Sequence, residues 1–458
     1  MKRSAGVVIL ILLLLLPLFS FPGKAGETLR LGDLAALPEG PALQSGYAVL
    51  METKSGAILF EKNATEKAYP ASITKIMTAI LTMENCSLND QLTFSYRATH
   101  ELEPGSSSIA RTEGEVMTVE ECLYALMVAS ANEVAQGLAE HISGSLEAFV
   151  DLMNRKAQDL GCVNTHFANT HGYHNPDHYS CAYDIALILK EALRHETLVE
   201  IMGTPAYQIP PTNKHSEITY LRSYHPLIIP GSSIKYPYAV AGKTGYTDEA
   251  LCTLATYAKK DDLDLVCVCM QSESQEVNGR DTISLFEYGF RWFTCYNLSK
   301  LDSMWNEGET PFLGKDLVRF TNAEPLYCTL PNQISVTELK SQTIFHGNQG
   351  GEGLATRIYT YQDHEVARSN LKWIPTTSNI ELTPVVQLVP SRNEVLREKH
   401  LGLPLIYWIL IGGGLGLLLL TWFTVWIAIR SVKRFQRKRA QAKRAMDRMT
   451  DDRFPPLI

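Results

Sequence analysis

The sequence predicts an α/β domain at residues 38–297, followed by a small all-β domain at 300–392 and a C-terminal transmembrane helix. Runs of strand character stand near both ends of the α/β domain, and the apolar spacing of helices dominates the segment between them. Short strand-like runs broken by glycine, proline and asparagine indicate the β domain. The strand-like runs lie at 46–61, 250–258, 263–270, 317–320, 326–330, 344–346, 356–361 and 383–388.

The composition is that of a folded protein with a sizeable core. Apolar residues make up 45% of the 458 residues, and charged residues make up 20%. The formal net charge is −7. The chain therefore has no general basic excess with which to neutralise phosphates, and we expect no nucleic-acid partner.

Both ends of the chain carry membrane signals. Residues 1–25 combine basic residues, an apolar run at 7–18 and small final residues, as secretory signal peptides do. An uncleaved anchor is the alternative, but that run is shorter than the roughly 20 residues that a span needs. Residues 401–429 hold no charge and predict a transmembrane helix, and the basic tail 430–458 predicts a cytoplasmic C-terminus. Residues 26–400 are then expected to be extracytoplasmic, at the cell membrane.

The cysteines and histidines do not form a recognisable metal or disulfide pattern. The nine cysteines are odd in number and include no Cys-x-x-Cys pair, so we expect no disulfide framework. The polar loop at 164–180 is rich in histidine but lacks the regular ligand spacing of a zinc site. We therefore expect neither a metal nor another cofactor. The loop histidines are His166, His171, His174 and His178.

Residues 69–84 join a turn to a helix that carries a hydroxyl and an amine. Pro70 fixes the chain before the helix, and apolar residues then recur at helical spacing. Ser72 lies in the first turn, and Lys75 follows one turn later on the same side. If burial keeps the amine partly neutral, it can accept the proton of the hydroxyl. Ser-x-x-Lys is short, and a helix-capping serine beside a solvated lysine is the other interpretation.

A second polar pair lies between two predicted helices. Residues 118–127 have an apolar helical face, and a second apolar helix runs to His141. Ser130 and Asn132 occupy the turn between them. Ser-x-Asn also occurs at 87–89 and 391–393, so order and spacing alone single out this copy.

Lys243, Thr244 and Gly245 stand just before the two strand-like runs at 250–258 and 263–270. A strand there would place an ammonium, a hydroxyl and an unobstructed backbone position on one sheet edge. Such an edge can pair with an extended peptide, and the ammonium and hydroxyl can hold a terminal carboxylate. Glycine leaves room for the backbone of the substrate.

With all three motifs in view, residues 40–295 resemble the penicillin-recognising serine enzymes. Among these, the chain is similar to the low-molecular-mass penicillin-binding proteins that act as D-alanyl-D-alanine carboxypeptidases. The resemblance implies a β-lactamase/transpeptidase-like catalytic domain, in which an antiparallel sheet is flanked by helices and accompanied by a helical subdomain. It implies peptidoglycan stem peptides as substrates and β-lactams as covalent inhibitors. Further matching segments lie at 167–172, 178–184, 242–248 and 287–290.

The roles of the family carry over to matching positions. Ser72 would attack the carbonyl of the penultimate D-alanine with Lys75 as general base, and Ser130 would relay a proton to the departing D-alanine. The backbone N–H groups of Ser72 and Tyr246 would form the oxyanion hole. The remaining expected substrate-binding residues are Asn132, Lys243, Thr244, Gly245 and Arg280, the last as a distant carboxylate-steering arginine ahead of a helix at 287–290.

Two departures from relatives matter. The loop at 171–178 contains no Glu-x-x-Leu-Asn, with which class A β-lactamases activate a deacylating water. Penicillin should therefore acylate Ser72 and leave slowly. Many relatives attach through an amphipathic helix, whereas this chain has a full span followed by a basic tail that could bind anionic lipid. The β domain would raise the active site above the membrane.

Two other functions stay open. A D,D-endopeptidase that cleaves peptidoglycan crosslinks would use the same residues. A membrane-tethered β-lactam sensor would acylate and signal through the tail, although residues 430–458 are too few for a folded effector domain.

Overall fold

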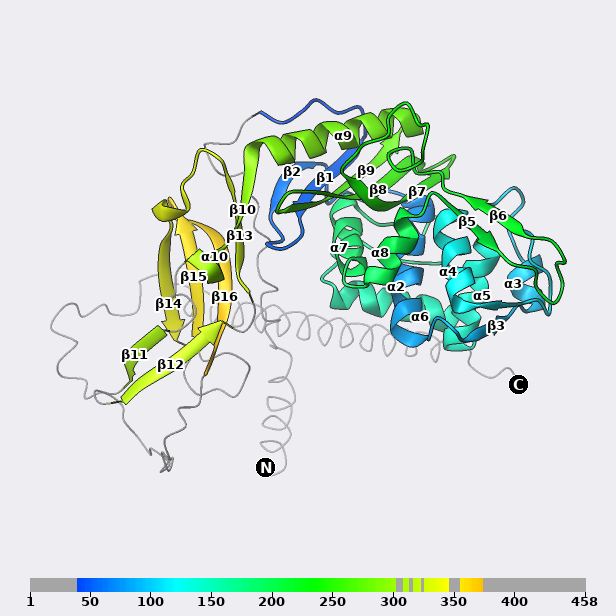
Figure 1. Ribbon diagram of the computed structural model, residues 1–458, viewed down its shortest axis with the longest axis horizontal. Coiled ribbons are helices and arrows are strands. Elements are labelled where there is room, and N and C mark those ends of the chain that lie inside the picture. The colour runs from blue at the N-terminus through cyan, green and yellow to red at the C-terminus, as the bar shows by residue number, and fades with distance from the viewer. Residues whose placement is uncertain (1–38, 302–307, 313–315, 323–324, 346–354, 374–458) are drawn as a thin grey trace, which may run out of the picture. The chain divides into compact units, whose positions relative to one another are not determined.

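The computed structural model describes residues 39–301, 308–312, 316–322, 325–345 and 355–373 (Figure 1). The expected signal peptide, transmembrane helix, basic tail and strand at 383–388 lie outside these residues. Among the described residues, no helix is both long enough and apolar enough to cross a membrane.

A five-stranded antiparallel sheet forms the centre of the catalytic region, with the strand order β2-β1-β9-β8-β7. The expected hairpin at 46–61 supplies β1 and β2, and β7 carries the Lys-Thr-Gly segment at the edge of the sheet. The bounds are β1 Tyr47–Glu52, β2 Ile58–Lys62, β7 Ala239–Thr247, β8 Leu251–Lys260 and β9 Leu263–Ser272.

Helices cover both faces of this sheet (Figure 1). Alternate side chains of β1 enter different cores: Val49 packs with the helical subdomain, and Leu50 packs with α9 (Gln275–Trp292). The other face of the sheet is covered by α7 (Ala182–Ala192) and α8 (Glu196–Gly203). A sheet buried on both faces explains why its strands are nearly continuous apolar runs.

The helical subdomain follows the first hairpin. Its α4 begins at a capping box, in which the Thr118 hydroxyl accepts the Glu121 N–H and the Glu121 carboxylate accepts the Thr118 N–H. The helices are α2 Lys75–Asn85, α3 Tyr96–His100, α4 Val119–Val128, α5 Asn132–Ser143 and α6 Leu146–Asp159. Two small two-stranded antiparallel sheets accompany them, β3 (Gln91–Thr93) with β4 (Val116–Thr118) and β5 (Ala206–Ile209) with β6 (Thr219–Arg222).

The region after α9 is rich in strands, as expected, but its first strand pairing crosses the expected domain boundary. Strand β10 (Phe293–Asn297) pairs with β13 (Tyr327–Pro331), so a strand from each side of residue 300 shares one ladder. A separate five-stranded sheet has the order β11-β12-β16-β15-β14. Its bounds are β11 Gly308–Phe312, β12 Asp316–Asn322, β14 Lys340–Phe345, β15 Ala355–Tyr361 and β16 His364–Trp373; α10 (Leu298–Leu301) and η4 (Val336–Glu338) are short helices.

Candidate active site

Ser72 lies in a tight turn in front of α2 rather than in the α-helix itself. The turn is the 3-10 helix η3 (Ala71–Thr74), and α2 begins at Lys75. Ala71 has a φ of 50°, which is strained for a residue with a side chain. Surrounding contacts hold the turn, since the Thr253 hydroxyl donates to the Pro70 carbonyl at 2.9 Å. The strain therefore sits beside the expected nucleophile, where active sites commonly store it.

Lys75 is fully buried and positioned by two contacts. Its Nζ lies 2.9 Å from Ser72 Oγ and donates to the carbonyl of His171 at 2.8 Å. The carbonyl comes from the histidine-containing loop, so that loop holds the amine against the hydroxyl. The distance to Ser72 is short enough for direct proton transfer.

Burial and a second ammonium favour the neutral form of Lys75. Burial lowers its pKa well below the usual range, and the positive charge of Lys243 lowers it further. The carboxylates of Glu133 and Glu103 oppose this shift more weakly. The lowered pKa favours the neutral amine, which is the form of Lys75 that can accept a proton as a general base.

Ser130 and Lys243 meet across the boundary between the helical subdomain and the sheet. Lys243 Nζ lies 3.1 Å from Ser130 Oγ and donates to the Thr244 carbonyl at 2.9 Å. Ser130 has a φ of 62°, again a strained conformation for a residue with a side chain. Burial lowers the pKa of Lys243 to about 7.

Asn132 begins α5, and its side chain has an unused hydrogen-bonding atom. The residue is 4% exposed, and its Oδ1 has no hydrogen-bond partner among the described residues. Its backbone N–H donates to the carbonyl of Ser107 at 2.8 Å, which fixes it against the Gly/Ser-rich loop. A buried, unpaired carboxamide oxygen at a pocket wall is suited to accept an N–H from a ligand.

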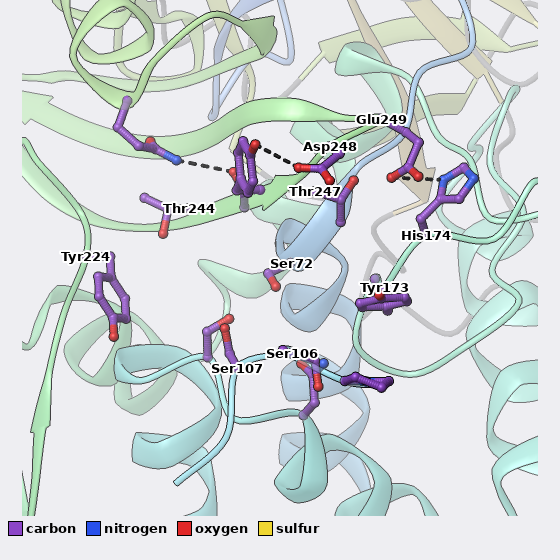
Figure 2. Close-up of a pocket in the computed structure, with 18 residues that line it drawn as sticks. Ser72, Ser106, Ser107, Tyr173, His174, Tyr224, Thr244, Thr247, Asp248 and Glu249 are labelled. Atoms are coloured by element: carbon purple, nitrogen blue, oxygen red, sulfur yellow. Dashed lines mark hydrogen bonds and ion pairs between the residues drawn. The ribbon is translucent and has the colours of Figure 1, made fainter. Parts of the chain in front are cut away.

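These groups surround one pocket of about 580 Å³ (Figure 2). Lys75 and Lys243 do not line it directly but touch it through Ser72 and Ser130. The described structure thus brings together eight of the nine residues expected at the site. The expected residues that line the pocket are Ser72, Ser130, Asn132, Thr244, Gly245 and Tyr246.

Arg280 is placed differently from the expectation. It lies inside α9, which begins at Gln275, and not ahead of a helix at 287–290. Its guanidinium is 62% exposed and pairs with Glu276 at 2.7 Å, and the residue is absent from the pocket lining. Arg280 was expected to precede the helix because the sequence indicated a helix only at 287–290, whereas α9 already begins at Gln275.

Gly245 allows β7 to approach the turn that carries Ser72. A Cβ atom at this position would lie 2.7 Å from the Ser72 nitrogen and would also collide with the Thr253 hydroxyl. Only glycine fits without displacement of the backbone. The Ser72 N–H, one of the two expected oxyanion donors, therefore lies against the strand that continues into Tyr246, the other.

Sequence reasoning missed two groups that shape the pocket. The loop containing Pro104 to Ser107 lines it, although its Gly/Ser-rich sequence indicated only a loop. Glu133 holds this loop: its buried carboxylate accepts the Ile109 N–H at 2.6 Å and the Ser108 hydroxyl at 2.8 Å. A carboxylate directly after Ser-x-Asn, at the start of an apolar helix, was the available signal.

Three of the four loop histidines, His166, His171 and His178, make hydrogen bonds within the protein. His178 is buried, with its Nε2 2.8 Å from the Thr74 hydroxyl, and burial lowers its pKa to about 3. All nine cysteines are free thiols. In the described residues, one group of possible metal ligands has its donor atoms within 4.8 Å of one another, and none of its members lines the pocket. That group is Cys86, Asp90 and His141.

Comparisons with known proteins agree with this geometry. Residues 35–274 match a family described as D-alanyl-D-alanine carboxypeptidase of the S11 peptidases. The chain is 31% identical over 343 residues to D-alanyl-D-alanine carboxypeptidase DacF of Bacillus subtilis, covering 72% of this chain and 84% of that protein. It is 30% identical over 305 residues to DacC of Escherichia coli, covering 64% and 73%.

Solved structures of a penicillin-binding protein and of a DD-transpeptidase are similar to this chain. The crystal structure of penicillin-binding protein 5 from Haemophilus influenzae has a TM-score of 0.63 and 25% identity, covering 74% of this chain and 98% of that one. The Streptomyces K15 DD-transpeptidase has a TM-score of 0.52 and 26% identity, covering 56% and 100%. With the family match extending over residues 35–274 of 458, the chain belongs to the D-alanyl-D-alanine carboxypeptidase family, the low-molecular-mass penicillin-binding proteins.

Proposed function

We propose that Ser72 is the nucleophile with which this chain, a serine-type D-Ala-D-Ala carboxypeptidase, removes the terminal D-alanine from peptidoglycan pentapeptide stems. Neutral Lys75 takes the hydroxyl proton as Ser72 Oγ bonds to the carbonyl carbon of the penultimate D-alanine. The peptide C–N bond then breaks, and Ser130 passes a proton to the departing amine. Water hydrolyses the resulting ester and regenerates Ser72.

The observation that carries this proposal is the contact between Lys75 Nζ and Ser72 Oγ at 2.9 Å, made by an amine whose pKa burial lowers well below its usual range. A solvated lysine beside a capping serine, the other interpretation of Ser-x-x-Lys, would be exposed and charged. Lys75 is 0% exposed. The geometry therefore supports Lys75 as the general base.

The substrate is held along β7. The terminal carboxylate lies with Lys243 and Thr244, and the Asn132 side chain receives a peptide amide through its free Oδ1. Gly245 lets the substrate backbone approach, and the N–H groups of Ser72 and Tyr246 stabilise the oxyanion. Arg280 enters the proposal only as a distant positive charge, because Glu276 already pairs with it.

A direct assay tests the assignment of Ser72. The purified full chain is incubated in detergent with diacetyl-Lys-D-Ala-D-Ala, and released D-alanine is measured. We expect release in the wild type, and we expect Ser72→Ala to lose both release and labelling by fluorescent penicillin. Labelling that persists in Ser72→Ala would place the nucleophile elsewhere. Crosslinked muropeptide in a parallel reaction tests endopeptidase activity, and acylation without turnover of either substrate would favour the sensor.

The location and attachment of the enzyme are also part of the proposal. Cleavage after residue 25, a span at 401–429 and a cytoplasmic tail would leave the active site extracytoplasmic and tethered to the membrane. Penicillin would acylate Ser72 and leave slowly. Release of the full chain from membranes by high salt or carbonate would contradict the transmembrane anchor.

A further inference from the structure

The active-site pocket is charged oppositely at its two ends. At one end Lys243 lies behind Thr244 and Ser130. At the other end the lining includes Asp248 and Glu249, which follow directly after β7. Figure 2 shows the side chain of Ser72 between Thr244 and these two carboxylates. A ligand with an anionic terminus and a cationic group further along its length would complement both ends.

The edge position of β7 sets the direction in which a peptide can bind. β7 pairs only with β8 in the central sheet, so its other side is available to an extended chain. When the terminal carboxylate of the substrate lies at Thr244, a peptide that pairs antiparallel to β7 places its preceding residues beside Thr247 and then Asp248. The side chains that precede the cleaved bond therefore approach the acidic end.

The distances match the third residue from the substrate C-terminus. Thr244 and Asp248 are four positions apart, which is about 13 Å in extended chain. The third residue lies two positions upstream of the terminal one, about 7 Å along. A side chain of three or four methylenes ending in an ammonium reaches across the remaining distance.

Both carboxylates have hydrogen-bonding capacity left for such an ammonium. Asp248 accepts the Tyr246 hydroxyl at 2.9 Å through Oδ1. Glu249 lies 3.8 Å from Nδ1 of His174, too far for a hydrogen bond. In the part of the chain that the structure describes, no lysine or arginine is paired with either residue, and both are exposed.

A separate observation indicates that a peptide occupies this pocket in a defined register. The carboxamide oxygen of Asn132 is buried, unpaired among the described residues and part of the pocket wall. It offers an acceptor to a substrate backbone N–H beside Ser72. Once that bond and the carboxylate contact are made, the position of the upstream side chain is fixed.

We infer that Asp248 and Glu249 select stem peptides whose third residue is a diamino acid with a free side-chain amine. This inference rests on the proposed function, since it assumes that the D-Ala-D-Ala terminus sits at Lys243 and Thr244. The carboxylates make a charge-assisted contact with the ammonium and discriminate against the same residue with its amine blocked. Because the contact is exposed, the discrimination is about three- to tenfold and falls as salt rises.

Two peptides that differ in one charge test the inference. The full chain is assayed with Nα-acetyl-Lys-D-Ala-D-Ala and with Nα,Nε-diacetyl-Lys-D-Ala-D-Ala, and the ratio of their kcat/KM values is the readout. We expect a ratio of about three to ten in the wild type. The double variant D248N/E249Q, which preserves the shape of both side chains, should bring the ratio close to one. Asp159→Asn removes an exposed carboxylate at the end of α6, outside the pocket, and should leave the ratio at the wild-type value.

The ratio separates this inference from the proposed function. A general loss of activity in a variant lowers kcat/KM for both peptides by the same factor and leaves their ratio unchanged. A wild-type ratio of one, or a ratio that survives in D248N/E249Q, overturns the selection by these carboxylates while leaving the carboxypeptidase intact. Absence of D-alanine release from both peptides in the wild type overturns the proposed function and this inference with it.

Discussion

Lys243 Nζ lies 3.1 Å from Ser130 Oγ, so a side chain of the sheet and a side chain of the helical subdomain meet at the wall of one pocket. The two residues are separated by 113 positions in the chain. The contact places the second ammonium of the site close enough to depress the pKa of Lys75. The fold thus links substrate binding and activation of the nucleophile electrostatically.

The pH dependence of kcat/KM should reflect the ionisation of Lys243. Burial lowers its pKa to about 7, so the ammonium is charged below that pH and neutral above it. If the charge holds the substrate carboxylate, kcat/KM falls as pH rises through about 7. Lys243→Arg keeps a charge at all accessible pH values, because guanidinium has a pKa above about 12, and should flatten this alkaline limb at lower overall activity. An unchanged alkaline limb in Lys243→Arg would assign it to another group.

Stability should respond to the same residue with a defined sign. A lysine whose pKa is lower in the folded state binds fewer protons there than in the unfolded state. Burial of Lys243 therefore lowers the stability of the folded protein near pH 7, and this cost becomes smaller as pH rises from about 7 towards the pKa of the unfolded state. Lys243→Met removes this unfavourable contribution. The variant should melt higher than the wild type near pH 7, and its advantage should shrink towards pH 10. Melting curves at a series of pH values measure the difference, and a constant difference would contradict the lowered pKa.

Gly245→Ala should damage the site through the backbone. The added methyl would lie 2.7 Å from the Ser72 nitrogen, and neither the strand nor the turn can move without disturbing the nucleophile. We expect a loss of about 1–3 kcal/mol in stability and a fall in the rate of penicillin acylation. Thermal melts and the acylation rate with fluorescent penicillin measure both effects. Acylation at the wild-type rate would show that the two backbones do not pack this closely.

The sequence predicted the parts of the site whose chemistry is local. Ser72 and Lys75 are one helical turn apart, so their contact could be expected from spacing alone. The pairing of Ser130 with Lys243 depends on how the helical subdomain packs on the sheet, and only the resemblance to a family indicated it. The role of Glu133 depends on a loop whose path is not encoded by periodicity.

The most extensive element that sequence reasoning underestimated is α9, of which only residues 287–290 were expected. Its buried face contains polar residues and two glycines, which conceal the apolar spacing. Asn278 donates to the carbonyls of Cys252 and Cys269, and Gly279 packs closely against Ile234. These buried interactions offset the weak helical pattern, and the late start expected for the helix is the reason Arg280 was misplaced.

Glu133 should be the residue that keeps the pocket wall at 104–110 in place. Its carboxylate is 0% exposed and accepts the Ile109 N–H at 2.6 Å and the Ser108 hydroxyl at 2.8 Å. Both loop donors converge on Glu133 Oε1. Glu133→Gln replaces this charged acceptor with a neutral amide oxygen, which accepts both hydrogen bonds more weakly. We expect a loss of about 1–3 kcal/mol in stability and faster hydrogen exchange in the loop.

The kinetic consequence distinguishes Glu133 from a residue that matters only for folding. Because the loop contacts Asn132 through the Ser107 carbonyl, a loosened loop should raise KM for the peptide more than it lowers kcat. Glu113→Gln is the matched control, since Glu113 is an exposed carboxylate in the adjoining segment and should change neither parameter. If Glu133→Gln lowered kcat and left KM and loop exchange unchanged, the carboxylate would act on the chemistry of Lys75 instead of on the wall of the pocket.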